Sequence, residues 1–347
     1  MMPELSQKWL YIIAVLIAFV LSVCATPLVR LAAVKMGWYD TPESEIKTHK
    51  VATPSLGGVA IWIAFAGTLV AMRFLTNFPT GTLYRLRAIL IGGGLVFLLG
   101  IVDDLRKPQG LGWKSKFVVQ IAAAALLVHF GIEIRFIQPH NLGVILTILW
   151  VVGICNAFNI IDIMDGLASS QAVVASLGFL LIALPSEDIY VNFGAAALVG
   201  AALGFFPWNM SSRYKIFMGD SGSLLLGFVL AALALGTDYT QVNPFGYYAP
   251  IFILLVPIFD TLYVMVIRMM RGRSPFLGSK DHFALRLERM GLNRLQVVLL
   301  SLLAAVFLTV CAWLVTIVGT MWAILIYFVV GSWVAILSWH LSKVDMR

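Results

Sequence analysis

The sequence predicts an all-α protein that crosses a membrane many times and forms one integral-membrane domain over residues 1–347. Hydrophobic residues make up 61% of the chain and charged residues 12%, whereas soluble globular proteins carry about 25% charged residues. The mean hydropathy is +0.94. Apolar stretches of about 20 residues, the length that a helix needs to cross a bilayer, occupy most of the chain. These observations exclude an ordinary water-soluble protein and leave little length for a second domain.

Eleven apolar segments are long enough, or nearly long enough, to cross a bilayer. The first lacks a small-residue cleavage site, which favours a retained span over a signal peptide. The third and fourth are short, so the count becomes ten if one of them is re-entrant. The segments are 9–29, 56–75, 86–102, 116–131, 144–161, 169–185, 190–207, 219–236, 248–267, 296–317 and 320–341.

The distribution of Lys and Arg predicts the orientation. If the N-terminus lies outside, 19 of the 24 basic residues fall on the C-terminal tail and on the connections that then face the cytoplasm, where membrane proteins carry their excess of basic residues. We therefore expect the C-terminus in the cytoplasm and the chain in the inner (plasma) membrane. The net charge of +7 favours contact with anionic lipids of the bilayer and with anionic substrates, and we expect no nucleic-acid partner.

Four polar side chains lie at and just after the end of the fifth apolar segment, at intervals of three residues: Asn156, Asn159, Asp162 and Asp165. If the helix continues through this stretch, all four lie on one half of its surface. Carboxylates at the end of a membrane helix are costly unless they serve a function, and a cation, or a phosphate held through a cation, suits them. A solvated helix end with ordinary caps is the alternative.

Two further acidic motifs lie at segment ends on the same predicted side. Asp103 and Asp104 close the third segment. Adjacent carboxylates repel each other, so they could bind Mg²⁺ or act as a general base. Alternatively, they could end a plain helix, with Arg106 and Lys107 balancing their charge. Asp220 begins the eighth segment, where backbone N–H groups attract phosphate. Its carboxylate would repel a phosphate unless a divalent ion lies between them, and a simple N-cap is the alternative.

Three more candidates come from loops and from an apolar run. Asp260 lies within the ninth segment, which makes it either a functional group or a buried partner for a Lys or Arg. His282, flanked by Lys280 and Arg286, could contact a diphosphate, although basic loops beside a membrane usually meet anionic head groups. Lys50 in the first cytoplasmic loop could bind phosphate. Because all these clusters fall on the cytoplasmic side, we expect one site at the membrane boundary, built from several helix ends.

This set of motifs resembles the polyprenyl-phosphate N-acetylhexosamine-1-phosphate transferases, glycosyltransferase family 4. Bacterial members of that family include the enzymes that start enterobacterial common antigen, O-antigen and teichoic-acid synthesis, and the muramyl-pentapeptide translocase. The resemblance covers nearly the whole chain, with the motifs in the family's order. They are Asp40–Pro42, His49–Gly58, Asp103–Asp104, Asn156–Ala168, Gly219–Gly227, Pro257–Thr261 and the loop around His282.

The resemblance implies the transfer of a sugar 1-phosphate, that of N-acetylglucosamine or a related N-acetylhexosamine, from a cytoplasmic UDP-sugar to undecaprenyl phosphate. The products are a lipid-diphosphate sugar and UMP, in the first membrane step of cell-surface polysaccharide synthesis. The implied cofactor is Mg²⁺, with Mn²⁺ as an alternative. A direct displacement and a double displacement through an aspartyl intermediate both stay open. The oligomeric state is open as well, with a homodimer as one alternative.

The resemblance also bears on the roles of individual residues. Asp220 matches the family's metal ligand. We predict catalytic roles for Asp103, Asp104 and Asp165. We predict substrate-binding roles for Lys50, Lys107, Asn156, Asn159, Asp162, His282 and Arg286.

Two departures from the family pattern concern the substrate. The loop after Asp281 keeps one histidine, His282, where members often carry two or three, and Ile163 stands where many have Gly. The His-rich loop of the muramyl-pentapeptide translocase is missing, which argues against a muramyl-pentapeptide substrate.

The alternative functions are a muramyl-pentapeptide transferase, a non-enzymatic secondary transporter and a non-catalytic scaffold. A transporter should show polar residues along whole spans and on both faces, whereas here the spans are clean and one face is bare.

Overall fold

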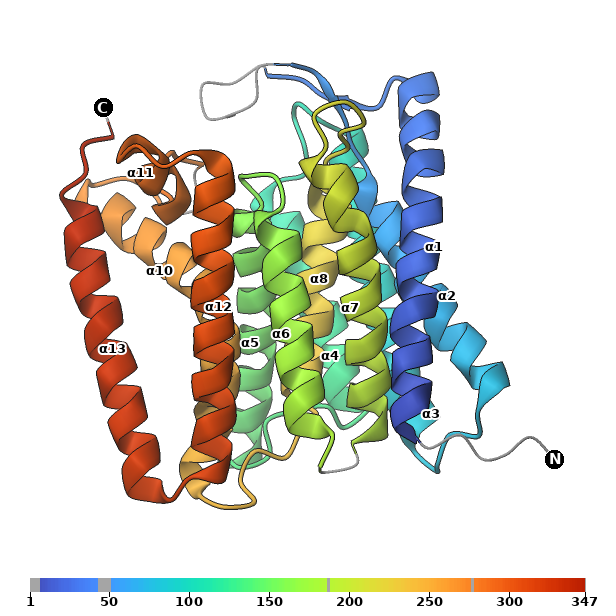
Figure 1. Cartoon of the computed structure of the whole chain (residues 1–347), viewed down its shortest axis with the longest axis vertical. Coiled ribbons are helices and arrows are strands. Elements are labelled where there is room, and N and C mark those ends of the chain that lie inside the picture. Colours follow the sequence, from blue (N-terminus) through green and yellow to red (C-terminus); the bar gives the residue numbers. More distant parts are fainter. Residues whose placement is uncertain (1–6, 43–50, 186–187, 276–277, 347) are drawn as a thin grey trace.

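The computed structural model describes residues 7–42, 51–185, 188–275 and 278–346. They form a bundle of helices with one short antiparallel pair of strands at one end (Figure 1). Lys50, a predicted substrate-binding residue, lies outside the described residues. The strands are β1 (Tyr39–Asp40) and β2 (Thr53–Pro54). The helices are α1 (Gln7–Met36), α2 (Gly57–Leu75), α3 (Thr82–Leu105), α4 (Trp113–His129), α5 (His140–Ile161), α6 (Leu167–Ala183), α7 (Ile189–Met210), α8 (Gly219–Ala234), η1 (Pro244–Tyr248), α9 (Ala249–Ile253), α10 (Leu255–Met270), α11 (Phe283–Arg289), α12 (Arg294–Ile317) and α13 (Thr320–Ser342).

Seven of the described helices are long and apolar enough to cross a membrane: α1, α2, α3, α5, α7, α12 and α13. An eighth span is added if η1 with α9 and the following α10, which meet at a bend of 73°, form one broken span. The predicted class, an all-α polytopic membrane protein, is confirmed. Each of the eleven predicted segments coincides with one helix or with the bent pair. The shorter helices α4, α6 and α8 decide whether the count of spans reaches eleven, so that count stays a prediction.

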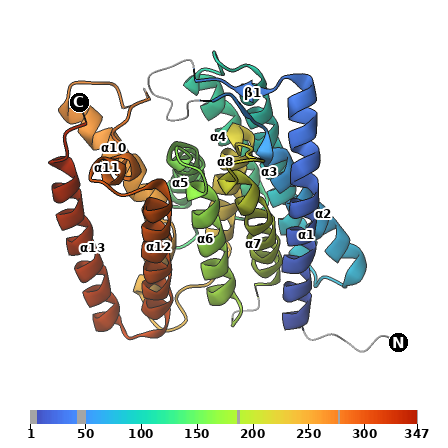
Figure 2. The same ribbon diagram turned by 45° about the horizontal axis from the view of Figure 1, so that its top comes forward.

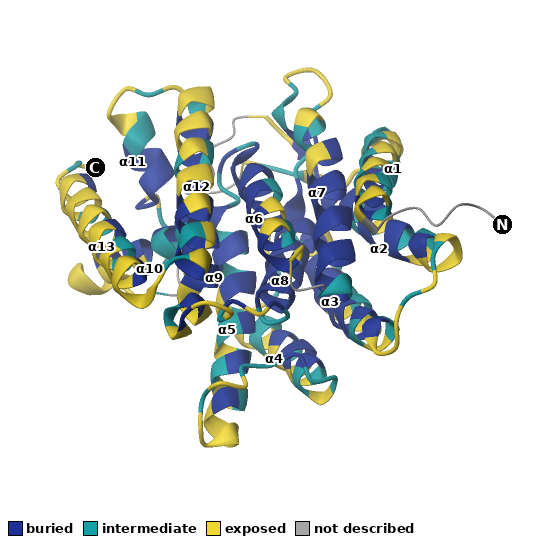
Figure 3. Cartoon of the chain, turned by 60° about the horizontal axis from the view of Figure 1, so that its bottom comes forward, coloured by how far each residue is buried: buried dark blue, intermediate teal, exposed yellow. Residues whose placement is uncertain are grey.

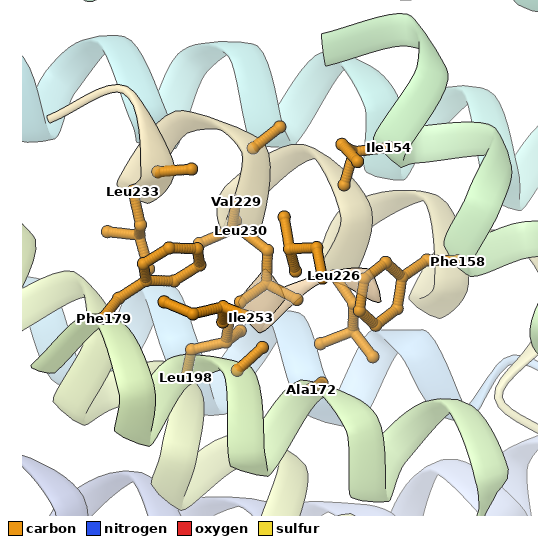
Figure 4. Packing of buried hydrophobic residues seen from close by; sticks show 14 of the residues in the cluster. Ile154, Phe158, Ala172, Phe179, Leu198, Leu226, Val229, Leu230, Leu233 and Ile253 are labelled. Carbon is orange, nitrogen blue, oxygen red and sulfur yellow. The ribbon is translucent and has the colours of Figure 1, made fainter. Parts of the chain in front are cut away.

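Helix α8 lies at the centre of the bundle, and all its residues except Asp220 are buried. It is surrounded by α2, α3, α5, α6 and α7 (Figure 3). Figure 4 shows Leu226 and Leu230 of α8 beside Phe158 of α5 and Phe179 of α6. A helix that is apolar on every side suits either a protein core or a lipid environment. Hydropathy alone therefore does not reveal that α8 is the central helix of the bundle.

Two glycines let neighbouring helices approach the start of α8 closely. A Cβ atom on Gly58 of α2 would overlap the backbone of Gly222, and one on Gly100 of α3 would overlap the backbone of Ser221. Helix α2 and the end of α3 therefore hold the first turn of α8 at backbone contact. This close packing fixes the position of Asp220, which lies in that turn.

The start of α1 and the end of α13 lie at opposite ends of the bundle (Figure 1). The end of α13, α11 and the strand pair share one end. Figure 2 turns this end forward and shows α4, α5 and α8 between α10 with α11 on one side and β1 with α1 on the other. The acidic motifs predicted from the sequence all come to this end.

The helix predicted to continue through Asp165 ends earlier. Helix α5 stops before Asp162, which has φ −76° and ψ 48°, and Gly166 precedes α6 with φ 78°, a conformation that glycine adopts at no steric cost. Asn156 and Asn159 therefore lie on α5, whereas Asp162 and Asp165 lie in the connection to α6. The expectation that all four share one helix surface is wrong.

Candidate active site

A cavity of about 740 Å³ lies where the ends of α5 and α10 meet the starts of α4 and α8. We call it the polar cavity. Acidic side chains of the α5–α6 connection and of α8 line it, together with basic side chains of α4, α10 and the segment after α3. Seven of the eleven predicted site residues line the cavity: Lys107, Asn156, Asn159, Asp162, Asp165, Asp220 and His282.

Two lysines and three carboxylates form a compact charged cluster on one wall of the polar cavity. Lys116 Nζ lies 2.6 Å from Asp220 Oδ2 and 3.0 Å from Asp103 Oδ2. Lys107 Nζ lies 2.7 Å from Asp104 Oδ1 and 3.4 Å from Asp220 Oδ1. Burial alone would lower the pKa of Lys107, but the carboxylates of Asp220 and Asp104 raise it above its ordinary value. Lys107 therefore stays charged, and with all five groups ionised the cluster carries one net negative charge.

The two adjacent carboxylates at the end of α3 point to different partners. Asp104 Oδ1 accepts the backbone N–H of Asp220, and Asp104 Oδ2 accepts that of Ser221, both at 3.0 Å. Asp103 Oδ1 accepts the backbone N–H of Leu111 at 2.6 Å. A side chain of α3 thus occupies the first amides of α8, which the sequence predicts to attract phosphate. That prediction is wrong for these two amides.

The carboxylates of the α5–α6 connection differ in their environment. Burial raises the pKa of Asp162 well above its ordinary value. Lys107 lowers this pKa and the Asp220 carboxylate raises it further. Asp165 instead accepts a hydrogen bond from Lys215 at 2.5 Å. Asp162 therefore holds a proton more readily than a free carboxyl group, and a cation entering the cavity would favour its ionised form.

Both predicted asparagines tie α5 to its neighbours. Asn156 Nδ2 donates to Gln120 Oε1 on α4 and to the carbonyl oxygen of Val152, each at 2.7 Å. Asn159 Nδ2 donates to Ser223 Oγ on α8 at 3.0 Å. These bonds fix the orientation of two polar side chains that line the cavity.

His282 and Asp260 form a buried pair on the side of the cavity next to α10. Asp260 Oδ2 lies 2.8 Å from His282 Nδ1, and Asp260 Oδ1 accepts the backbone N–H of Phe283 at 2.9 Å. The partner of Asp260 is thus a histidine, not the Lys or Arg that the sequence analysis considered. A carboxylate on Nδ1 places the proton there and directs the ring, so Asp260 orients a side chain that lines the polar cavity.

Arg286 does not reach the polar cavity. Its side chain is fully buried, and its Nη2 lies 3.0 Å from Asp281 Oδ1. Its Nη1 donates to the carbonyl oxygens of Leu341 and Val344, each at 2.9 Å. Arg286 therefore connects α11 to the C-terminal end of α13, and the geometry does not support its predicted role in substrate binding.

The sequence of this chain is similar to those of known proteins, and this similarity identifies its family. Residues 86–238 match the family model described as glycosyl transferase family 4. A probable undecaprenyl-phosphate N-acetylglucosaminyl 1-phosphate transferase of Bacillus subtilis is 34% identical over 309 residues, which cover 85% of this chain and 83% of the relative. A decaprenyl-phosphate N-acetylglucosaminephosphotransferase of Mycolicibacterium smegmatis is 32% identical over 82% of this chain and 77% of its own length. A phospho-N-acetylmuramoyl-pentapeptide-transferase of Staphylococcus saprophyticus is 32% identical over 74% of this chain and 82% of its own length.

The chain belongs to glycosyl transferase family 4. The family predicted from the motifs is confirmed. The part that matches the family model runs from α3 past the end of α8 and contains the charged cluster and the α5–α6 connection. His282 and Arg286 lie beyond it. Membership in this family of enzymes sets aside the transporter and the scaffold that the sequence analysis kept as alternatives.

Two basic residues that line the polar cavity of this family 4 member were not predicted from the sequence as site residues. Lys116 bridges two carboxylates, and Arg268 lines the cavity while donating to the carbonyl oxygen of Pro275 at 2.6 Å and to Ser279 Oγ at 3.1 Å. From the sequence, both residues contributed only to the predicted orientation. The available signal was their position, because each lies at the end of an apolar segment on the side of the membrane where the acidic motifs are also expected.

Proposed function

We propose that this member of glycosyl transferase family 4 transfers N-acetylglucosamine 1-phosphate from UDP-N-acetylglucosamine to a polyprenyl phosphate, undecaprenyl phosphate in particular. Relatives named as undecaprenyl- and decaprenyl-phosphate transferases of this sugar phosphate support the proposal. The observation that carries it is the charged cluster, in which Lys107 and Lys116 interleave with the carboxylates of Asp103, Asp104 and Asp220 beside a large cavity.

The reaction joins two anions, and the residues of the cluster suit that task. An oxygen of the lipid phosphate attacks the phosphorus that carries the sugar. The bond from this phosphorus to the oxygen of the UMP group breaks, and its electron pair leaves with UMP. Lys107 and Lys116 offset the repulsion between the two substrates and the charge that develops on UMP. A phosphate monoester is already a competent nucleophile, so the side chains need to move few protons.

We propose Mg²⁺ as the cofactor, with Mn²⁺ as a substitute. Within the described residues no group of three or more His, Cys, Asp or Glu side chains is placed to hold a metal ion. Mg²⁺ commonly takes only one or two protein carboxylates and completes its shell with substrate phosphates and water. Asp220 and Asp162 both line the polar cavity, and their hard carboxylate oxygens fit this ion. Bound there, it would neutralise charge on the phosphates.

We further propose that the whole chain works as one membrane domain of about eleven spans in the inner (plasma) membrane. In this proposal the N-terminus lies outside, and the polar cavity opens to the cytoplasm, where UDP-sugars are found. Two observations support the orientation. The start of α1 and the end of α13 lie at opposite ends of the bundle (Figure 1), and 19 of the 24 basic residues belong to the tail and connections assigned to the cytoplasm.

A muramyl-pentapeptide donor is the second candidate, because the relative from Staphylococcus saprophyticus carries that activity in its name. The two candidates differ in the donor alone. One assay therefore separates them: purified protein in detergent micelles, undecaprenyl phosphate and Mg²⁺ are mixed with each donor in turn, and UMP is quantified.

We expect UMP release with UDP-N-acetylglucosamine that requires both the lipid phosphate and the divalent ion. Release with the muramyl-pentapeptide donor alone would transfer the assignment to the second candidate. Absence of release with every UDP-N-acetyl sugar would refute the proposed reaction.

A further inference from the structure

Asp104 joins the end of α3 to the start of α8 through a buried carboxylate. Its side chain is 0% exposed. Oδ1 accepts the N–H of Asp220 and a hydrogen bond from Lys107 at 2.7 Å, and Oδ2 accepts the N–H of Ser221. The first amides of a helix have no partner within the helix, and a negative charge at this end is also favoured by the helix dipole. Asp104 therefore caps α8 from a position 116 residues away in the sequence.

The surrounding backbone is shaped for this contact. Gly219 has φ +73°, and a Cβ atom there would overlap Asp104 Oδ2. Gly100, one turn before Asp104 on α3, lies against the backbone of Ser221. Met218, at the N-cap position of α8, makes no side-chain hydrogen bond to the helix. The cap that residues of the same segment usually supply comes here from α3.

The contacts of Asp104 conflict with a role as general base or phosphate ligand. Each of its oxygens already accepts a backbone N–H of α8, and leaving a buried N–H without an acceptor carries a large penalty. Asp103 differs, because its Oδ2 faces the ammonium group of Lys116, which lines the polar cavity. The two adjacent carboxylates thus have separate tasks.

We propose that Asp104 is a positioning residue, which caps α8 and thereby holds the carboxylate of Asp220 in the polar cavity. The effect of Asp104 on catalysis rests on the proposed function, whereas its capping of α8 does not depend on that function. Loss of the cap should loosen the first turn of α8 before any substrate is bound. Loss of a base would leave that turn intact.

The test compares hydrogen exchange in Asp104→Asn, Asp103→Asn and wild-type protein in micelles without substrate. Asparagine has the same shape but offers one acceptor oxygen, so at least one amide loses its partner. We expect the amides of Asp220 and Ser221 to exchange about tenfold faster in Asp104→Asn, the size expected for the loss of an N-cap. In Asp103→Asn they should exchange as in the wild type. Unchanged exchange in Asp104→Asn overturns the proposal.

A second readout separates positioning from base catalysis. In Asp104→Asn the rate of UMP release should fall while the acid limb of its pH profile keeps its midpoint. Disappearance of that limb in this variant would identify Asp104 as the base and overturn the proposal. If wild-type protein releases no UMP, the proposed function fails, but the exchange result still decides the cap.

Gly219→Ala tests the same contact from the side of α8, and it serves if Asp104→Asn does not accumulate as folded protein. A methyl group here would overlap Asp104 Oδ2, and φ +73° is itself strained for alanine, so this variant should reproduce the faster exchange of the Ser221 amide. Slow exchange in Gly219→Ala would contradict the proposal.

Discussion

Replacing Lys116 by methionine should lower kcat/KM for UMP release by about a hundredfold. The ammonium group lies 2.6 Å from Asp220 Oδ2 and 3.0 Å from Asp103 Oδ2, and its side chain is 18% exposed. Methionine keeps much of the length of the side chain and removes the charge. Loss of one preorganised electrostatic contact to a reacting group costs about 3 kcal/mol of transition-state stabilisation, which corresponds to about a hundredfold in rate. In the variant, two carboxylates also lose the cation between them.

Lys114→Met is the matched control. Lys114 is exposed, does not line the polar cavity, and has its Nζ 5.6 Å from the centre of the Trp113 ring. Both variants remove one positive charge from the start of α4, so the change in net charge is the same. The assay measures kcat and KM for donor and acceptor separately in micelles. If Lys116→Met stays within threefold of Lys114→Met, the assignment of Lys116 to the site is refuted.

Three further predictions follow from the contacts around the cavity. Asp260→Asn should lower kcat/KM about tenfold, because an amide cannot accept from both His282 Nδ1 and the Phe283 N–H, and a kinetic profile equal to the wild type would contradict this. Arg286→Met should lower the Tm in detergent by several degrees, because it leaves buried partners just before α11 and at the end of α13 unpaired. Arg289→Met, at an exposed position of the same helix, should lower the Tm less, and equal Tm values in the two variants would disprove the link. Burial raises the pKa of Asp162 in the folded protein, so the folded state retains a proton that the unfolded chain releases above about pH 4. Stability should therefore fall as the pH rises through the folded pKa, and Asp162→Asn should flatten this dependence of the Tm on pH; an identical slope would contradict the raised pKa.

The location of the site could be predicted from the sequence, because a carboxylate beside an apolar run is costly unless it has a function. Asp103, Asp162 and Asp220 belong to distant segments, yet each was expected at the same side of the membrane, and the structure brings all three to one end of the bundle. The distribution of charged residues along the chain therefore predicts on which side of the membrane the site lies.

The partners of individual side chains could not be predicted in the same way. Asp104 binds backbone amides of α8, and Arg286 binds carbonyl groups at the end of α13, and both contacts depend on how distant helices pack. The sequence also suggested a helix through Asp165, because three-residue spacing cannot show that the chain turns at Gly166. The close approach of α2 and α3 to the start of α8, at Gly58 and Gly100, likewise can be seen only in the three-dimensional structure.

The most direct test of the central claim follows the phosphorus next to the sugar. UDP-N-acetylglucosamine labelled at this phosphorus is incubated with the purified protein, undecaprenyl phosphate and Mg²⁺, and the lipid and aqueous phases are then separated. We expect the label to move into the lipid phase with the sugar while UMP remains unlabelled. Label that stays in water-soluble UDP, with the sugar alone on the lipid, would contradict sugar 1-phosphate transfer and with it the role assigned to the polar cavity.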